Sequence, residues 1–227
     1  MTHSRRDSVA IAVVAKAPVA GQVKTRMQPP LTPSQAAGLA VAMLADVTAA
    51  ALATGAAVWW SYAGSRAVLD DLRPSGVRLL EQVGDGLGPR LAHTHRVLHE
   101  GGHDRVLVVG ADCPTVDAAA LTMAVDLLDC HDVVIGPASD GGYTLLGTTT
   151  CSPALFTDVP MSTAHTGADT IAVAERLGLR VALTEPRPDL DTFADLVSAL
   201  DGGWLAAAPF TRRLAEQLVG NRITAGG

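Results

Sequence analysis

Three cationic side chains follow the first apolar segment of the chain. Val9–Ala15 contains only apolar residues, and Lys16, Lys24 and Arg26 come soon after it. The loop after a first strand binds phosphate groups in open α/β sheets, because backbone N–H groups and cations gather at the carboxyl ends of strands. We therefore predict a local phosphate site, with a solvated basic loop as the alternative.

The segment Gly21–Thr25 has the outline of a P-loop but lacks one required residue. A P-loop places a glycine directly before its lysine, whereas Val23 precedes Lys24 here. The P-loop assignment fails, yet a flexible cationic loop still suits nucleotide phosphates. The candidate phosphate-binding residues of this loop are Lys16, Gly21, Lys24, Thr25 and Arg26.

A second glycine-rich segment, residues 83–91, lies between an expected strand and an expected helix. The dinucleotide-binding fingerprint would need glycine at position 89, where the chain has Pro89, so we do not assign a dinucleotide site. The turn either brings its backbone close to a ligand or only connects two elements. Its candidate binding residues are Gly86, Leu87 and Gly88.

Asp112 follows a second segment with the pattern of a buried strand, Arg105–Gly110. This position lies at the sheet edge where ligands gather. Carboxylate oxygens are preferred ligands of Mg²⁺ and Mn²⁺, which in turn bind phosphate oxygens. Asp112 is therefore a candidate metal ligand, and a contact within its own turn is the alternative.

Asp189 and Asp191 are two residues apart, so in an extended segment their side chains point to the same side. Neighbouring carboxylates repel one another unless a cation or solvent intervenes. A metal ion at Asp191 would remove this cost. In the alternative interpretation, Asp191 or Thr192 caps the helix that follows.

Asp140 precedes a glycine between two apolar runs, which is a strong signal for a β-hairpin turn. The pattern by itself favours a turn. The functional alternative places the Asp140 carboxylate in a cleft, where it would act as a catalytic base or contact the substrate.

Histidine recurs in one helical pattern, but a zinc site would need a further ligand and an enclosed geometry. We favour a polar outer face for these side chains, although their role stays open. The histidines are His93, His95, His99 and His103. The odd cysteine count, without a C-x-x-C pair, indicates neither disulfides nor a cysteine zinc site and fits a reducing cytoplasm.

Short apolar runs alternate with helical periodicity along the chain, which predicts a mostly parallel sheet covered by helices on both faces. The expected strands are Ser8–Ala15, Ala56–Ala63, Val77–Val83, Arg105–Gly110, Asp132–Pro137, Tyr143–Gly147 and Arg180–Thr184. The expected helices are Pro33–Ala53, Leu87–Glu100, Asp117–Cys130, Thr166–Leu177 and Thr192–Leu200. Thr32, Pro33 and Gln35 form a capping box with proline at the first helical position.

The composition indicates one soluble α/β domain. The chain has 227 residues, 48% of them apolar, and a net charge of -6, which argues against a nucleic-acid surface or an anionic membrane partner. The apolar tract Ala36–Trp60 contains Asp46 and Gly55, which argues against a membrane span. We expect a flexible tail at residues 1–7 and a domain over 8–202. Residues 203–227 form a C-terminal helix and tail, which either docks on the domain or covers a second copy in a homo-oligomer.

Six segments together, in this order, resemble one family. The segments are KAPVAGQVKTRM, GDGLGPRL, VGADCP, GPASDGGYTLLG, VPMST and DLDTFADL. The chain resembles a bacterial glycosyltransferase-A-fold family of uncharacterised proteins of the arsenosugar-biosynthesis type. That family is related to nucleotidyltransferases such as phospholactate guanylyltransferase. The chain departs from the common pattern at Met161, where tryptophan is usual, and at Phe193 and Ala194, where proline and glutamate are usual.

The resemblance implies a single-domain, Rossmann-like nucleotide-diphospho-sugar transferase fold with a mixed, mostly parallel sheet. It implies that Asp112, with Asp191, holds Mg²⁺ or Mn²⁺ against nucleotide phosphates that Lys24 and Arg26 also bind.

Three functions stay open at this point. The leading hypothesis is transfer of a sugar from a nucleotide-sugar donor to an unknown small-molecule acceptor, with Asp140 as the catalytic base. The second is nucleotidyl transfer from a nucleoside triphosphate with release of pyrophosphate. The third is a nucleotide-binding regulatory protein without turnover.

Overall fold

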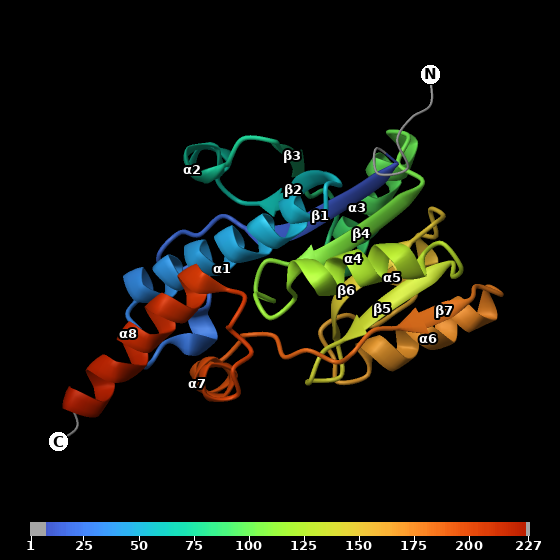
Figure 1. The fold of residues 1–227 in the computed structure, drawn as a ribbon. Coiled ribbons are helices and arrows are strands. Elements are labelled where there is room, and N and C mark those ends of the chain that lie inside the picture. Colours follow the sequence, from blue (N-terminus) through green and yellow to red (C-terminus); the bar gives the residue numbers. More distant parts are fainter. Residues whose placement is uncertain (1–7, 226–227) are drawn as a thin grey trace.

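The computed structural model describes residues 8–225, with side chains described up to residue 220. One seven-stranded sheet crosses the molecule (Figure 1). Its strands are β1 (Val9–Lys16), β2 (Ala57–Ala63), β3 (Val77–Glu81), β4 (Arg105–Gly110), β5 (Val133–Pro137), β6 (Tyr143–Thr148) and β7 (Val181–Leu183). The helices are α1 (Pro33–Ala53), α2 (Arg66–Leu72), α3 (Leu87–Glu100), α4 (Ala118–Leu127), α5 (Ala154–Thr157), α6 (Thr166–Arg176), α7 (Phe193–Asp201) and α8 (Pro209–Ala225).

The strand order is β3-β2-β1-β4-β6-β5-β7, and β6 alone among these strands runs against its neighbours. The predicted mixed, mostly parallel sheet is therefore confirmed. From β1 the chain builds outward to β2 and β3 and then returns to place β4 on the other side of β1. This reversal opens a crevice at the carboxyl ends of β1 and β4, where α/β sheets bind ligands.

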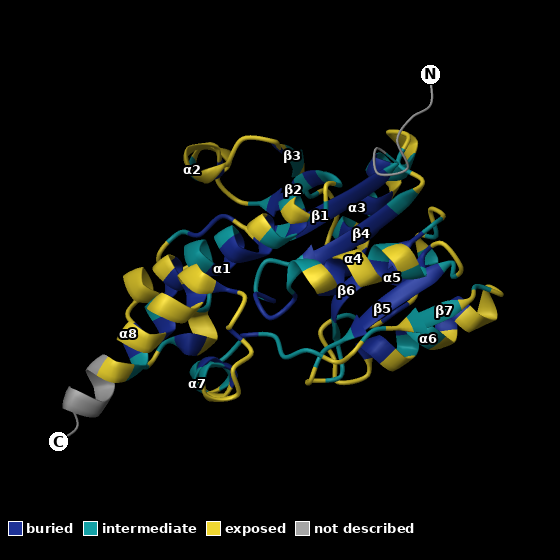
Figure 2. Cartoon of the chain, viewed as in Figure 1, coloured by how far each residue is buried: buried dark blue, intermediate teal, exposed yellow. Residues whose placement is uncertain are grey.

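Helices cover both faces of the sheet, so the central strands are buried on both sides (Figure 2). On one face Ile11 and Val13 pack in a cluster with residues of α1, α2 and α4. On the other face Ala10 and Ala12 pack in a cluster with residues of α3, α5 and α6. Burial of both faces explains why the β1 sequence is apolar at every position before Lys16.

A third hydrophobic cluster fixes two loops of the crevice. Met27 lies in the cluster from the short 3-10 helix Thr25–Met27, and Leu190 lies in it from the segment before α7. Both side chains are fully buried against α1, α7 and α8. The loop after β1 and the segment before α7 are far apart in sequence, and this shared core brings them together.

Helix α1 begins as predicted and packs one side against the sheet. The Thr32 hydroxyl accepts from the Gln35 N–H, the Gln35 side chain accepts from the Thr32 N–H, and Pro33 opens the helix. Further along, the buried Asp46 carboxylate accepts from the backbone N–H groups of Phe210 and Thr211 at the start of α8. Helix α8 therefore lies along α1 (Figure 1).

Among the described residues, α1 is the single helix whose length and apolar composition would allow it to cross a membrane. It packs against β1, β2 and α8.

The predicted element ranges are confirmed with small differences at their ends, but two short helices were not predicted. Helix α2 has seven residues and α5 has four, which is too short for apolar periodicity to be visible in sequence. The expected tail at residues 1–7 lies outside the described residues. Helix α8 docks on α1, which favours the docked alternative for the C-terminal segment.

The predicted polar outer face for the histidines is wrong for His95. This side chain is 1% exposed, its ring centroid lies 4.6 Å from that of Phe156, and its Nδ1 lies 3.3 Å from the Thr148 hydroxyl. His99 Nε2 lies 3.0 Å from the same hydroxyl. No cluster of three or more metal-binding side chains of the His, Cys, Asp and Glu types occurs within residues 8–220.

Burial and the neighbouring His99 lower the pKa of His95 to about 3. Between pH 3 and about 6.5 the unfolded chain therefore binds a proton that the folded chain does not, so stability falls as pH decreases through this range. We predict that His95→Leu removes up to about 1.4 kcal/mol of this loss for each pH unit below 6.5. Urea unfolding at pH 7.5, 6 and 5 measures the effect, with exposed His165→Leu as the control. Equal pH slopes in wild type and His95→Leu would show that His95 is not the cause.

Candidate active site

Lys24 is turned toward the crevice by an unusual backbone conformation. It adopts left-handed angles, with φ of 47°, directly before the 3-10 helix Thr25–Met27. The buried Met27 anchors this helix in the third cluster. As a result the Lys24 side chain is only 9% exposed, whereas Arg26, two residues later, is 76% exposed.

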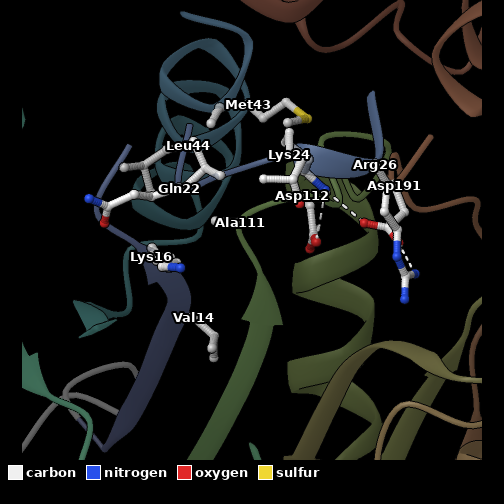
Figure 3. Close-up of a pocket in the computed structure, with 14 residues that line it drawn as sticks. Val14, Lys16, Gln22, Lys24, Arg26, Met43, Leu44, Ala111, Asp112 and Asp191 are labelled. Carbon is white, nitrogen blue, oxygen red and sulfur yellow. Dashed lines mark hydrogen bonds and ion pairs between the residues drawn. The ribbon is translucent and has the colours of Figure 1, made fainter. Parts of the chain in front are cut away.

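The Lys24 ammonium group links the two loops of the crevice. Its Nζ lies 3.1 Å from Asp112 Oδ2 and 3.5 Å from Asp191 Oδ1, and it donates to the Leu190 carbonyl at 2.6 Å. The Arg26 guanidinium donates to Asp191 Oδ2 at 2.6 Å. We call Lys24, Arg26, Asp112 and Asp191 the Lys24 cluster; Figure 3 shows its side chains turned toward one another.

The pKa values of Lys24 and Asp112 favour the charged forms of both groups. Burial alone would lower the pKa of Lys24, but the charges of Asp112 and Asp191 outweigh it and raise the pKa above its ordinary value. Burial would likewise raise the pKa of Asp112, and the charge and hydrogen bond of Lys24 outweigh it and lower that pKa. Lys24 and Asp112 therefore form an ion pair in which each group favours the charged form of the other.

The helix-cap alternative is confirmed for Thr192 and is wrong for Asp191. Thr192 is the N-cap of α7, and its hydroxyl and backbone N–H form a capping box with Asp195. The Asp191 carboxylate is thus left to pair with Arg26 and Lys24. The Leu190 N–H donates to the Asp112 carbonyl at 3.0 Å, which fixes the segment beside the end of β4.

Asp189 has the opposite electrostatic environment. Burial, followed by the charges of Asp140, Asp112 and Asp191, raises the pKa of Asp189 above its ordinary value. No ion-pair partner of Asp189 or Asp140 occurs among the residues the structure describes. The sequence showed Asp189 as one of two paired carboxylates but gave no sign of this environment, which depends on the approach of the Asp140 turn.

Two cavities meet at the Lys24 cluster. The first, of about 270 Å³, extends over the loop after β1; Lys16 lies on its wall apart from the ion pairs (Figure 3). The second, of about 380 Å³, extends toward Asp140 and Tyr143. Both share Arg26, Asp112 and Asp191, together with Val14. The cluster therefore lies between two cavities, and two substrates of one reaction can occupy one cavity each.

The structure brings most of the predicted site residues together at these cavities. Lys16, Lys24, Thr25, Arg26, Asp112 and Asp191 line the first cavity, and Leu87, Asp140, Arg26, Asp112 and Asp191 line the second. Of the predicted residues, Gly21, Gly86 and Gly88 line neither cavity. Gly88 has a packing role, because a Cβ there would lie 2.3 Å from the Phe156 carbonyl oxygen.

Asp140 combines the two interpretations of its segment. Its Oδ1 accepts from the Gly142 N–H at 2.9 Å, and Gly141 has φ of 90° with a Cβ position only 2.0 Å from the Ala164 carbonyl oxygen. The predicted turn between β5 and β6 is confirmed. The same turn places Asp140 on the wall of the second cavity.

Several residues of the second cavity were not predicted as site residues. They are Tyr143, Thr144, Ser162, Thr163, Thr166 and Asp189. Ser162 has left-handed backbone angles with φ of 61°, in the segment that the sequence had already marked as VPMST. Isolated hydroxyl side chains such as Ser162 and Thr163 carry no spacing signal in the sequence, so only the fold identifies them as cavity residues.

The cluster is compatible with a divalent cation that a substrate helps to hold. Asp112 and Asp191 converge on one ammonium group, and their side chains are 44% and 37% exposed, so their oxygens are accessible from both cavities. Mg²⁺ usually binds one or two carboxylates together with substrate phosphates and water. Two convergent carboxylates therefore fit this ion without a third protein ligand.

The fold is shared with solved structures of nucleotide-dependent enzymes. A putative nucleotide-diphospho-sugar transferase from Desulfovibrio desulfuricans G20 has 26% identity and a TM-score of 0.82, covering 93% of this chain and 98% of that one. A CMP:2-keto-3-deoxy-manno-octonic acid synthetase complexed with CTP has 14% identity and a TM-score of 0.57, covering 86% and 98%. The second likeness concerns the fold alone.

A transferase is also found among the sequence relatives of this chain. The 2-phospho-L-lactate guanylyltransferase of Methanothermobacter thermautotrophicus is 32% identical over 123 residues, which are 54% of this chain. The match spans only about half, 55%, of that relative. The profile of the family described as an uncharacterised protein conserved in bacteria (DUF2064) matches residues 43–163, more than half of the chain, which therefore belongs to this family.

Proposed function

We propose that this protein is a metal-assisted glycosyltransferase that moves a sugar from a nucleotide-sugar donor to a small acceptor. The observation that carries the proposal is the Lys24 cluster between two cavities at the end of β1 and β4. We assign the donor nucleotide to the first cavity and the transferred sugar and acceptor to the second. We also propose a cytoplasmic location, where the three free cysteines stay reduced.

The charges of the cluster support the use of a metal ion. Lys24 and Arg26 carry two positive charges, and Asp112 and Asp191 carry two negative charges, so the cluster is neutral as a unit. Exposed Lys16 alone then faces the first cavity as an additional cation. One ammonium group does not balance a diphosphate. Mg²⁺ or Mn²⁺ at Asp112 and Asp191 would supply the missing charge and stabilise the leaving diphosphate.

The protein side chains then have distinct tasks. Lys24, released from part of its pairing with the carboxylates, and Arg26 bind the diphosphate oxygens. Thr25 and Lys16 lie on the wall of the first cavity and hold the nucleotide there. Positive groups placed in advance around the leaving group lower the barrier, because they need no reorganisation as charge develops.

Asp140 is the proposed catalytic base. The acceptor oxygen forms a bond to C1 of the donor sugar, and the bond from C1 to the diphosphate oxygen breaks with its electron pair going to the diphosphate. The proton of the acceptor hydroxyl passes to the Asp140 carboxylate, which lines the second cavity. Asp189 lines the same cavity, and burial together with the charge of Asp140 raises the pKa of Asp189.

Nucleotidyl transfer is the second candidate. The 32% identical guanylyltransferase relative supports it, and Lys24 with Arg26 would then bind the β- and γ-phosphates of a nucleoside triphosphate. The second cavity favours the first candidate, because Asp140 and Asp189 line it without an ion-pair partner among the described residues, whereas Asp112 and Asp191 are balanced within the Lys24 cluster. The negative field of these carboxylates suits a neutral sugar better than a phosphorylated acceptor.

The third candidate is a nucleotide-binding regulatory protein without turnover.

Turnover with nucleotide sugars and nucleoside triphosphates, with and without Mn²⁺, distinguishes these functions. Release of a nucleoside diphosphate from a nucleotide sugar supports glycosyl transfer. Release of pyrophosphate from a triphosphate would show nucleotidyl transfer instead. Binding without any product would indicate a regulatory protein, and no binding in either panel would exclude a nucleotide function.

We predict that Asp112→Asn abolishes the metal-dependent rise in melting temperature that nucleotides produce. The amide keeps the shape of the side chain but loses the charge that a divalent ion needs. Thermal shift with a nucleoside diphosphate and Mn²⁺ measures the effect, and exposed Asp126→Asn on α4 serves as the control. An Asp112→Asn variant that responds as wild type does would refute the metal assignment.

We predict that Lys24→Met lowers the free energy of unfolding by about 1–3 kcal/mol in metal-free buffer, because Asp112 and Asp191 lose their shared cation. Their partial exposure keeps the loss below that of a fully buried pair. Added Mg²⁺ should restore more stability to Lys24→Met than it adds to wild type. Urea unfolding measures both effects, with Lys16→Met as the control for loss of a loop cation. A variant with wild-type stability in metal-free buffer would contradict the ion-pair account.

A further inference from the structure

We propose that Trp204 forms the floor of a binding site for a neutral, hydroxyl-rich ring, and that this ring belongs to the acceptor. The inference rests on the proposed transferase function and extends it to a substrate class. It starts from a third, open cavity of about 690 Å³ that adjoins the second. The two cavities share Arg26, Asp140, Asp189 and Asp191. From these residues the third cavity extends to Trp204, beyond the end of α7.

The Trp204 side chain is held in place although it is 42% exposed. Its backbone N–H donates to the Ala199 carbonyl at 3.0 Å, and Gly203 before it has φ of 73° at the end of α7. The indole Cδ1 lies 3.0 Å from the position of a Cβ on Gly202, so a side chain at that position would press on the ring. A fixed, exposed aromatic ring loses little conformational entropy when a ligand binds to it.

Arg187 lies over the indole of Trp204, and its guanidinium group already has hydrogen-bond partners in the protein. Its guanidinium carbon is 5.9 Å from the ring centroid, and the same group donates to the Thr115 carbonyl and to Asp117 Oδ2. These contacts connect Arg187 to the start of α4. The cation therefore positions the indole and is not directed toward a ligand anion in the cavity.

The polar groups of the third cavity are mainly hydrogen-bond acceptors. Arg26 is paired with Asp191, and Asp195 is occupied by the capping box of α7. Asp140 and Asp189 remain, and no ion pair to either occurs among the residues described. Ligand hydroxyl groups can donate to these carboxylates, whereas a phosphate or carboxylate would be repelled by them.

An exposed aromatic ring beside unpaired carboxylates suits a sugar-like ligand. The C–H groups of a saccharide ring can pack on the indole, while its hydroxyl groups donate to Asp140 and Asp189. The serine and threonine side chains that line the same cavity, Ser139, Thr192 and Ser198, add further hydrogen-bonding groups. Asp140 lies on the walls of both the second and third cavities, so a ligand that packs on Trp204 can extend through the third cavity toward the proposed base.

Saturation-transfer NMR on the full chain tests this site without any nucleotide. The probes are the methyl α-glycosides of glucose, galactose and mannose, and the 6-phosphates of the same three sugars. We expect at least one neutral glycoside to bind, with its ring C–H protons receiving the strongest saturation. Trp204→Ala should weaken this binding about three- to tenfold. Phe210→Ala, which removes an exposed aromatic ring from the start of α8, should not change it.

Three results would overturn the inference. They are the absence of binding by any neutral glycoside, tighter binding of the 6-phosphates than of the neutral glycosides, and equal binding by wild type and Trp204→Ala. If Trp204→Ala does not fold, Trp204→Leu keeps apolar bulk without a ring and takes its place. Nucleotide binding is measured separately by thermal shift. Its absence in wild type would refute the proposed transferase function. The saccharide site would still be tested by the NMR measurement alone.

Discussion

The ion pairs of Lys24 with Asp112 and Asp191 are the interaction on which the proposed site depends. Each carboxylate comes from a different part of the chain, one after β4 and one before α7. The lysine itself comes from the loop after β1. Lys24 and Asp112 each favour the charged form of the other, and with Arg26 and Asp191 the four side chains carry no net charge. A polyanionic substrate can enter such a site only if it brings positive charge with it, which is why metal and nucleotide binding should be coupled.

The hydrophobic core explains how these three groups are held at one point. Met27 and Leu190 are buried in the same cluster against α1, α7 and α8. Met27 anchors the loop after β1, and Leu190 anchors the segment before α7. Asp46 on α1 accepts two hydrogen bonds from the start of α8. These bonds hold α8 against the cluster. The helices at the end of the chain thus stabilise the loop near its beginning. In this protein the C-terminal helix is part of the structure that positions the site.

Much of this architecture could be predicted from the sequence, because it depends on local patterns. The continuous apolar run of β1, the capping box at Thr32 and the turn at Asp140 each have a signal within a few residues. Lys24, Asp112 and Asp191 were predicted as site residues, but their direct contact depends on the packing of Met27 and Leu190. The burial of His95 and the proposed role of Trp204 could not be predicted. Both depend on which side of a helix or loop packs against the rest of the protein, and this is not visible in a local pattern.

The coupling of metal and nucleotide binding is the central claim, and calorimetric titration of Mn²⁺ tests it most directly. The titration is carried out on the wild-type chain with and without a saturating nucleoside diphosphate, and the nucleoside diphosphate is titrated with and without Mn²⁺. We expect each ligand to raise the affinity of the other by the same factor, as linkage requires, with weak binding of either one alone. Equal Mn²⁺ affinity in the presence and absence of nucleotide would contradict the account.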